Sequence, residues 1–290
     1  MPKVKVYLAG GLGNQIFSYY FGFWLSHSQK NELKVIYDDQ SILGINHGLG
    51  LQYFELPYGE FELGKSKQIR LREILLNLAW KISQKKKNHL AQKVFSIFGS
   101  TDTWTRDFPM IEYKVRRVFG QYHSNLFVDW LVDQDKNWRI KLVDESSWYR
   151  DKSRLIQEID PTVVHIRRGD YEQKIPESLL PVTYFQKALR EMSTECQRKP
   201  IWVFTDDEDA AKKLTLGLDI IIIDSKESNE AENLMVMSLA KRIIISNSTY
   251  SWWAAKLGQP NYVAYPDPWF VGRDVPENFF PSEWKPIKWT

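Results

Sequence analysis

Two adjacent arginines and an aspartate follow a short apolar stretch in the middle of the chain. The run His165-Ile166-Arg167-Arg168-Gly169-Asp170 places charges where they are costly unless something pairs with them. Since neighbours in an extended chain point to opposite faces, Arg167 and Arg168 are expected to have different roles. One guanidinium can bind a phosphate through two parallel hydrogen bonds, and the other can pair with Asp170 and brace the loop. A purely structural knot of ion pairs is the alternative.

A hydroxyl-bearing segment further along the chain has the properties of an anion site. Asn247, Ser248 and Thr249 come directly before an apolar segment, 251–257, that is expected to be helical. Hydroxyl groups and backbone N–H groups at a helix N-terminus attract negative charge. Ordinary capping of the helix by serine or threonine is the alternative. Together with the arginine cluster, the segment favours a site for a nucleoside diphosphate that gains charge as it leaves a sugar.

A glycine-rich turn follows the first apolar stretch of the chain. Gly11, Gly13 and Asn14 belong to the run Gly10-Gly11-Leu12-Gly13-Asn14-Gln15. Its spacing differs from the G-x-G-x-x-G pattern, so it is weak support for a dinucleotide site. Glycines let a backbone approach a ligand closely, and Asn14 would present its amide group near the start of a helix. The alternative is a tight turn without a ligand.

Acidic residues at 206–209 admit three interpretations. Asp207 and Asp209 form an Asp-x-Asp pair, which could hold a divalent metal under a diphosphate. Acids in the first turn of a helix also complement the helix dipole without binding a metal, and this interpretation is preferred. Asp206, at the end of a predicted strand, could accept a hydrogen bond from a nucleoside base or a ribose.

The four clusters stand where a parallel sheet would present them. Short apolar strands alternate with helical segments, which is typical of a doubly wound α/β sheet covered on both faces. In such sheets ligands bind beyond the carboxyl ends of the strands. Strands are expected at 4–8, 33–37, 162–166, 201–204, 220–223 and 242–245, and helices at 15–28, 67–98, 184–195, 207–216, 230–240 and 251–257.

Composition and charge argue against several classes of protein. The net charge of +3 over 290 residues is too small to indicate a nucleic-acid partner. A single cysteine, Cys196, excludes an intrachain disulfide and fits a reducing compartment. The sequence shows neither a signal-peptide pattern nor an apolar run long enough to span a membrane, so a cytoplasmic location is expected. The basic residues Lys85, Lys86 and Lys87 are either a solvated helix end or a peripheral contact with anionic lipid on the inner membrane face.

The motif series as a whole resembles that of the bacterial alpha-1,2-fucosyltransferases, glycosyltransferase family 11. The resemblance rests on 10–15, 165–171, 204–207 and 246–253, whose order and spacing match the family across residues 8–257. It implies a GT-B-like α/β fold in which two Rossmann-like halves face a central cleft. Residues 1–155 would form the acceptor-side half, and residues 156–290 would form the half that binds the GDP-sugar.

The resemblance also implies a reaction. L-fucose would pass from GDP-fucose to the 2-hydroxyl of a terminal beta-galactoside, with inversion and without a metal or other cofactor. The acceptor could be a lipid-linked oligosaccharide, as in the synthesis of a surface polysaccharide such as O-antigen. Three alternatives stay open: a module that binds GDP or a sugar without turnover, a fucosyltransferase of another linkage such as alpha-1,6, and a metal-dependent transferase.

Motif positions assign most of the marked residues to the donor. Arg167 would hold the beta-phosphate, while His165 and Asp206 would lie at the guanine. The hydroxyl groups of Ser248 and Thr249 would contact the diphosphate. The whole donor-binding set comprises Gly11, Gly13, Asn14, His165, Arg167, Asp206, Asn247, Ser248 and Thr249.

The residues expected to carry the chemistry are Arg167, Asp170 and Asn14. Inversion needs a group that accepts the proton of the acceptor hydroxyl, unless the leaving phosphate does so itself. Asp170 is the candidate base, and its competing role is to brace an arginine. Asn14 would lie near the fucose and the acceptor. His123 stands where the family usually has glutamine, so it either touches the acceptor or is a buried histidine with a satisfied hydrogen bond.

Overall fold

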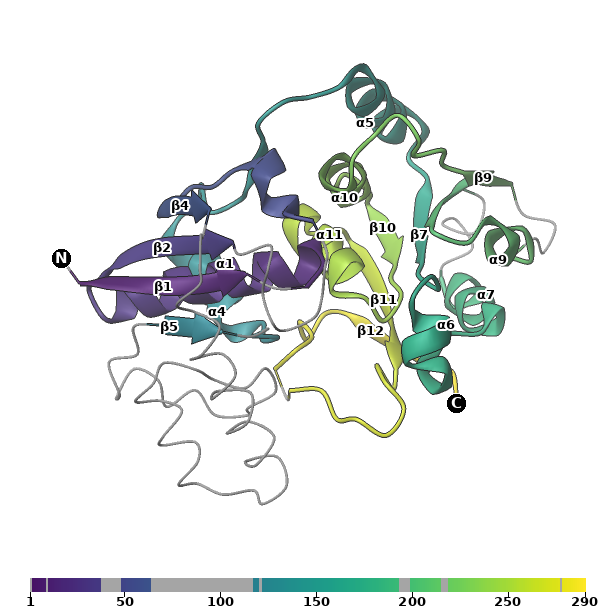
Figure 1. Ribbon diagram of the computed structural model, residues 1–290. Helices are drawn as coiled ribbons and strands as arrows, with labels where there is room; N and C mark the ends of the chain where they lie inside the picture. The colour runs from purple at the N-terminus through teal and green to yellow at the C-terminus, as the bar shows by residue number, and fades with distance from the viewer. Residues whose placement is uncertain are drawn as a thin grey trace. The chain divides into compact units, whose positions relative to one another are not determined.

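The chain divides into two compact units that are interleaved in the sequence. The computed structural model describes residues 2–8, 10–37, 48–63, 117–119, 122–192, 199–214, 219–276 and 278–290 (Figure 1). The first unit is Met1–Lys141 with Pro276–Phe280, and the second is Leu142–Val275 with Pro281–Thr290. The predicted helix at 67–98, the basic residues Lys85–Lys87 and Cys196 lie outside the described residues, so the predicted membrane contact stays a prediction.

The first unit is built around a parallel sheet of four strands in the order β4-β2-β1-β5. Its second strand follows a long helix that packs on the first, which confirms the predicted βαβ beginning. Its elements are β1 (Lys3–Leu8), α1 (Leu12–Ser28), β2 (Glu32–Tyr37), the 3-10 helix η1 (Gly50–Tyr53), β3 (Phe54–Glu55), β4 (Glu60–Leu63), β5 (Arg117–Phe119) and α4 (Leu126–Gln134).

Helix α1 lies close against β1 because Gly22 has no side chain at the contact. A Cβ atom at Gly22 would stand 2.0 Å from Cγ2 of Val6. Alternate residues of β1 are buried, which directs Val4, Val6 and Leu8 into the core. The helix begins at Leu12, three residues before the predicted start, because Gly11 is its N-cap. Gly13 and Asn14 therefore belong to its first turn.

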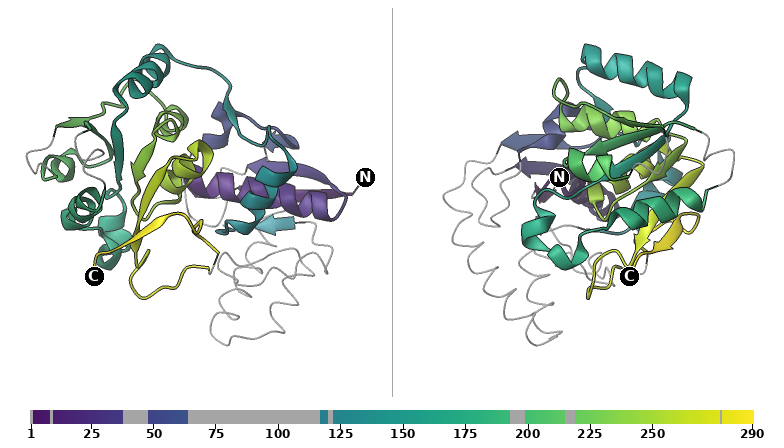
Figure 2. Two further views of the ribbon diagram at one scale, coloured as in Figure 1. Left: turned by 180° about the vertical axis from the view of Figure 1, so that it is seen from behind. Right: turned by 90° about the vertical axis from the view of Figure 1, so that its right-hand side faces the viewer.

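The second unit contains a six-stranded parallel sheet in the order β12-β11-β10-β7-β8-β9. Read from β9, this is the doubly wound order in which the chain reverses direction between the first and fourth strands. Helices α7 and α9 cover one face, and α10 and α11 cover the other (Figures 1 and 2). The elements are β6 (Lys141–Leu142), α5 (Ser147–Ile159), β7 (Thr162–Ile166), α6 (Tyr171–Lys174), the 3-10 helix η3 (Pro176–Ser178), α7 (Val182–Arg190), β8 (Ile201–Thr205), α9 (Glu208–Lys212), β9 (Ile220–Ile222), α10 (Glu230–Ser238), β10 (Arg242–Ile244), α11 (Thr249–Gly258), β11 (Tyr262–Asp267) and β12 (Lys285–Lys288).

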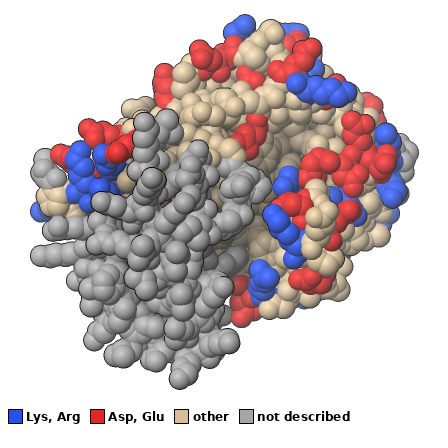
Figure 3. Space-filling model, in the orientation of Figure 1, with Lys and Arg blue, Asp and Glu red and all other residues tan. Residues whose placement is uncertain are grey.

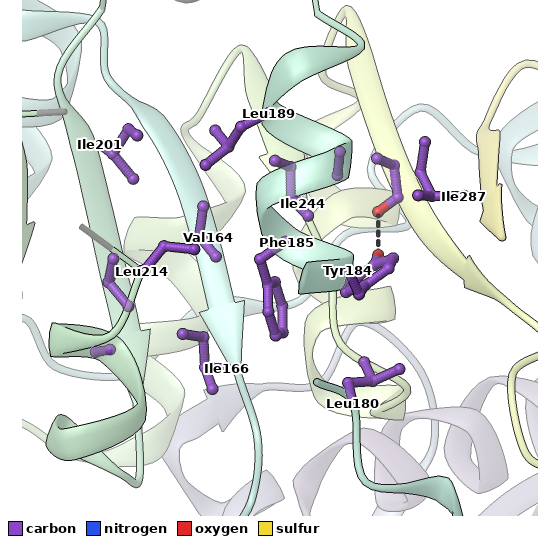
Figure 4. Close-up of a cluster of buried hydrophobic side chains, with 14 of the residues drawn as sticks. Val164, Ile166, Leu180, Tyr184, Phe185, Leu189, Ile201, Leu214, Ile244 and Ile287 are labelled. Atoms are coloured by element: carbon purple, nitrogen blue, oxygen red, sulfur yellow. Dashed lines mark hydrogen bonds between the residues drawn. The ribbon is translucent and has the colours of Figure 1, made fainter. Parts of the chain in front are cut away.

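One hydrophobic cluster of the second unit lies between α7 and the sheet, as Figure 4 shows. Phe185 and Leu189 of α7 pack with Val164 and Ile244, and all four side chains are buried. The hydroxyl of Tyr184 donates to the backbone oxygen of Ile245 at 2.7 Å, so the one polar atom that this ring carries into the core is satisfied. This packing fixes the strand ends from which the polar loops emerge.

The division between the units falls earlier than the predicted boundary near residue 155. Helix α5 belongs to the second unit, since its N-terminal residues bond to the segment around α10. The Ser146 N–H donates to Oε1 of Glu232 at 2.8 Å, and the Trp148 indole donates to the Asp224 carbonyl at 2.9 Å. The roles expected for the two halves are functional and stay predictions.

Among the described residues, no helix is long and apolar enough to cross a bilayer. Basic and acidic side chains lie next to one another over the part of the surface that Figure 3 displays, in keeping with the small net charge.

Candidate functional site

Three of the four predicted clusters meet at the point where the sheet of the second unit reverses direction. Strand β7 has β10 on one side and β8 on the other, with Val164 level with Ile244 and with Val203. The loops that follow these strands contain Arg167, Asn247 and Asp206, so the three loops leave the sheet at neighbouring strand ends. The chain leaves β7 and β10 in opposite directions at this point, and in such folds ligands bind at the point of reversal. The structure thus brings together the segments 165–170, 206–207 and 246–249, as the sequence predicted.

Arg167 is held between two carboxylates. One terminal nitrogen lies 2.7 Å from Oδ1 of Asp170, and the other lies 2.7 Å from Oδ2 of Asp206. The guanidinium carbon is 5.9 Å from the ring centre of Tyr171, within the range of a cation–π contact. About a third of the side chain remains exposed, at 32%. The guanidinium is therefore fixed in place and still reachable from solvent.

Arg168 points to a different set of partners. Its backbone N–H donates to Oδ1 of Asp206 at 2.8 Å, while its side chain forms ion pairs with Asp207 at 3.0 Å and Glu172 at 3.1 Å. The expectation that one arginine would face a phosphate and the other would pair with Asp170 is wrong in this detail. Asp170 pairs with Arg167, because the alternation of the chain turns Arg168 toward α9 and α6 instead.

The environment of Asp170 suits a brace better than a base. Its Oδ2 atom lies 2.8 Å from the ammonium group of Lys174, in addition to the pair with Arg167. Burial raises the pKa of Asp170, but Lys174 and Arg167 together outweigh burial and hold that pKa below its usual value. A carboxylate with a lowered pKa is a weak proton acceptor at neutral pH. The geometry therefore favours the bracing role for Asp170.

His165 joins the ends of the two central strands. Its Nδ1 atom is 2.9 Å from the hydroxyl oxygen of Ser246, and its ring centre is 5.5 Å from that of Tyr250. Burial, with a smaller effect of the charge on Arg167, lowers the pKa of His165 to about 3. The imidazole is therefore neutral at physiological pH. It is available to a ligand only through a small exposed fraction of 6%.

Residues in the segment 246–249 have two roles: Asn247 anchors the loop, and Ser248 and Thr249 begin helix α11. The side-chain nitrogen of Asn247 donates to the Ser178 and Trp269 carbonyls at 2.7 and 3.1 Å, so this amide holds the loop rather than facing solvent. The hydroxyl of Ser248 caps α11 by accepting from the Tyr250 N–H at 3.3 Å. Thr249 is the first residue of that helix. The backbone N–H groups of this first turn form the anion-attracting end of α11.

The Asp-x-Asp pair is used by the protein itself. Asp207 is the N-cap of α9, with Oδ1 accepting from the Ala210 N–H at 2.9 Å and Oδ2 paired with Arg168. Asp209 is exposed and lies near Lys212. Both oxygens of Asp207 thus have partners, which supports the helix-start interpretation of these acids. In the part of the chain that the structure describes, no group of three or more His, Cys, Asp or Glu side chains is placed to hold a metal.

The glycine turn belongs to the first unit, whereas the other three clusters belong to the second. Gly11 caps α1, and Asn14 in its first turn has its Oδ1 atom 3.1 Å from Nε2 of His123. His123 is buried, and burial lowers its pKa to about 3. The interpretation of His123 as a buried histidine with a satisfied hydrogen bond is confirmed.

Sequence reasoning missed Gln15, which anchors the loops around this turn. Its side-chain nitrogen donates to the Gly10 and Gly48 carbonyls, each at 2.8 Å, and its Oε1 accepts from the Leu51 N–H at 3.3 Å. A polar residue inside an apolar helical run was the available signal, since such a residue must find partners when it is buried.

Glu230 is a second residue that the motifs did not mark. It is the first residue of α10, and its backbone oxygen accepts from the Tyr250 hydroxyl at 2.5 Å. Glu230 as a residue is exposed; desolvation of its carboxyl group by the surrounding chain raises its pKa, and the charge on Arg167 partly offsets this effect. A carboxylate with a raised pKa that is affected by the charge on Arg167 is a candidate functional residue. The sequence did not mark it, because an acidic residue in the first turn of a helix ordinarily complements the helix dipole.

The two buried neutral histidines predict that acid destabilises both units. His123 and His165 have a folded-state pKa of about 3, against an ordinary value of 6.5. Below pH 6.5 the unfolded chain therefore binds protons that the folded chain rejects, and the free energy of unfolding falls as the pH falls. We expect a loss of about 2 kcal/mol for each histidine between pH 7.5 and 5.0.

Urea unfolding at both pH values measures this loss. The carboxylates with lowered pKa, such as Asp170, titrate below this window, while the raised pKa of Glu230 acts on stability in the opposite sense to the histidines. His123→Gln and His165→Asn should each flatten the dependence. A slope that survives both buried substitutions would show that other groups are responsible.

Comparison with known proteins bears on the chemistry of this site. The sequence pattern of glycosyl transferase family 11 matches residues 150–279. The chain is 26% identical to an O-antigen biosynthesis glycosyltransferase, WbnK, of Escherichia coli, over 92% of this chain and 95% of that protein. It is 27% identical to an alpha-1,2-colitosyltransferase of Escherichia coli, over 100% of this chain and 98% of that protein. Among solved structures, the fucosyltransferase NodZ from Bradyrhizobium aligns with a TM-score of 0.49 and 12% identity, over 87% of this chain and 91% of that one.

Proposed function

We propose, given that the chain belongs to glycosyltransferase family 11, that it transfers L-fucose from GDP-fucose to the 2-hydroxyl of a terminal beta-galactoside, with inversion and without a metal. Family membership sets aside the alternative of a binding module without turnover. The observation that carries the proposal is the meeting of Arg167 and the start of α11 at the reversal point of one sheet. A departing diphosphate needs fixed positive charge at such a point.

The site would stabilise the leaving group without reorganising itself. Asp170 and Asp206 already hold the guanidinium of Arg167 in one orientation. Donors that are fixed before the reaction stabilise developing charge better than donors that must first turn toward it. In this scheme Arg167 binds the beta-phosphate, and Ser248 and Thr249 with the N–H groups of α11 bind the neighbouring phosphate oxygens. His165 and Asp206 lie beside the guanosine.

A second sugar donor, GDP-colitose, should be assayed beside GDP-fucose. One relative that matches the whole chain is named an alpha-1,2-colitosyltransferase. Colitose is L-fucose without its 3-hydroxyl group, so both sugars could use the same diphosphate site. Comparing kcat/KM for GDP-fucose and GDP-colitose on one acceptor decides which sugar the protein prefers. A product with an alpha-1,6 rather than an alpha-1,2 linkage would contradict the proposed reaction for either donor.

The proposed acceptor rests on the family and on the other relative, WbnK. WbnK is named for O-antigen biosynthesis, which suggests an oligosaccharide acceptor, free or lipid-linked, for this chain as well. A panel of beta-galactosides linked to glucose, N-acetylglucosamine and N-acetylgalactosamine, each assayed with and without excess EDTA, tests the acceptor and the metal requirement together. Loss of turnover in EDTA would contradict a metal-free reaction.

Guanine specificity gives a prediction that does not depend on the acceptor. GDP at a hundredfold excess over its Kd should stabilise the folded protein by about 2.7 kcal/mol and raise the Tm by several degrees. UDP and ADP share the diphosphate but not the base, so each should raise the Tm less. Differential scanning fluorimetry with the three nucleotides at equal concentration measures the difference. Equal shifts would remove the guanine assignment and leave only a diphosphate site.

A further inference from the structure

We propose that His123 is a positioning residue that fixes the side-chain amide of Asn14 for the sugar end of the transfer. The proposal rests on the proposed function, because it concerns how the first unit would present a hydrogen-bond donor to a sugar. It is drawn from the fold of that unit and from one hydrogen bond.

The pair lies at the reversal point of the smaller sheet. In the order β4-β2-β1-β5, the chain leaves β1 through α1 toward β2, while β5 lies on the other side of β1. Tyr7 is level with Phe119, so the carboxyl ends of β1 and β5 are neighbours. Asn14 follows β1 and His123 follows β5. Reversal points of parallel sheets are where ligands bind, so the pair bridges the two loops at the ligand-binding edge of this unit.

The chemistry of the hydrogen bond fixes its direction. An amide oxygen can only accept, and Oδ1 of Asn14 lies 3.1 Å from Nε2 of His123. The imidazole is neutral, since burial lowers its pKa to about 3. Nε2 must therefore carry the single ring hydrogen and donate it. With the oxygen held in this way, the amide turns its NH2 group away from the imidazole.

Packing keeps the imidazole in its orientation. The ring centre of His123 lies 5.0 Å from that of Phe17 in an edge-to-face contact and 5.8 Å from that of Phe279. Only 5% of the residue is exposed. The following segment is tied down by the Asn125 N–H, which donates to the Asn278 carbonyl at 2.7 Å. A ring with no room to turn gives the amide of Asn14 one stable orientation.

An oriented amide would serve the proposed transfer. Sugars present hydroxyl oxygens that accept hydrogen bonds, and a donor whose orientation is fixed before the reaction needs less reorganisation during it. Without His123, the amide could flip and present its oxygen instead. We expect the loss to appear in kcat/KM for transfer and not in the affinity for GDP, because the diphosphate site lies in the second unit.

Two substitutions separate the hydrogen bond from the packing. His123→Phe keeps an aromatic ring but removes the donor, and should lower kcat/KM about threefold to tenfold. His123→Gln keeps an NH2 donor of similar reach, and should stay within about twofold of the wild type. In an Asn14→Ala background, His123→Phe should have no further effect, because the amide that it positions is gone. His27→Phe is the matched control, because His27 is exposed near the end of α1, the helix that carries Asn14. It should leave kcat/KM unchanged.

The outcomes distinguish the positioning role from the proposed function. Equal losses in His123→Phe and His123→Gln, full activity in His123→Phe, or losses that multiply in the Asn14→Ala background would overturn the positioning role while the transferase assignment stood. Absence of turnover by the wild type with both donors would overturn the proposed function. In that case, 15N NMR of the histidine ring still tests the pair. Hydrogen on Nε2 at pH 7 supports the bond, and hydrogen on Nδ1 contradicts it.

Discussion

Replacing Arg167 by alanine is expected to lower kcat/KM for sugar transfer by a factor of about ten to several hundred, with the fold intact. The estimate follows from the loss of charge-assisted hydrogen bonds to the departing diphosphate, each of which contributes about 1.5 to 3 kcal/mol. The substitution also removes one cation from Asp170, which keeps its pair with Lys174, and leaves Asp206 with the Arg168 N–H alone, so less positive charge would stand between these carboxylates and the phosphates. Initial rates of GDP release and product formation measure the effect.

The fold should survive because the ion pairs of Arg167 are partly exposed. The side chains of Asp170 and Asp206 are 31% and 27% exposed, and ion pairs open to solvent contribute little to stability. Arg154→Ala is the matched control, since Arg154 also pairs with two carboxylates, Asp151 and Glu158, but on the outer face of α5. It should leave turnover unchanged. Retained activity in Arg167→Ala, with a normal circular dichroism spectrum, would contradict the phosphate role.

Gly169→Ala is expected to reduce kcat/KM about tenfold or more without adding or removing a charge. A Cβ atom at Gly169 would stand 2.6 Å from Oδ2 of Asp206, closer than such contacts occur. That oxygen is the one that holds Arg167. The carboxylate must move away, and the guanidinium would lose one of its two supports, so the charge that meets the phosphates would no longer be fixed. The loss of one charge-assisted bond sets the magnitude.

Stability should change little in Gly169→Ala, because the displaced atom ends a side chain and is not backbone. Gly48→Ala is the matched control, since a Cβ atom there would meet nothing within 4 Å. Steady-state rates and Tm values for both variants measure the contrast. If Gly169→Ala keeps full activity, the fixed orientation of Arg167 is not needed for catalysis.

The central strands of the second unit could be predicted because each is a continuous apolar run. The expected strand at 162–166 matches β7, and the expected strand at 242–245 differs from β10 by one residue. Strands β11 and β12 were missed because Pro266 and Pro286 interrupt them and Lys285 and Lys288 flank the short apolar part of β12. Strand β12 stands at the edge of the sheet, where proline and charge are tolerated, so its sequence carries little pattern. Strand β11 is paired on both sides, and its proline lies next to its last residue, Asp267.

The site could be predicted as a set of neighbouring segments but not as a set of contacts. A parallel sheet brings the carboxyl ends of its strands to one edge, so the approach of 165–170 to 206–207 and 246–249 followed from the expected parallel sheet alone. Which carboxylate each arginine would choose did not follow, because that depends on how the loop turns after β7. The same limit applies to Asn247, whose polar side chain read as a ligand contact and instead holds the Ser178 and Trp269 carbonyls.

The path of the chain near its C-terminus has a consequence for dissecting the protein. Pro276–Phe280 belongs to the first unit, and Pro281–Thr290 returns to the second. A single cut after Lys141 therefore cannot release two complete halves. The N-terminal fragment would lack Phe279, which packs against Phe17 and His123, and the C-terminal fragment would carry that apolar ring without its neighbours. Exchange of halves between relatives would need three junctions, with the short 276–280 segment transferred together with the N-terminal part.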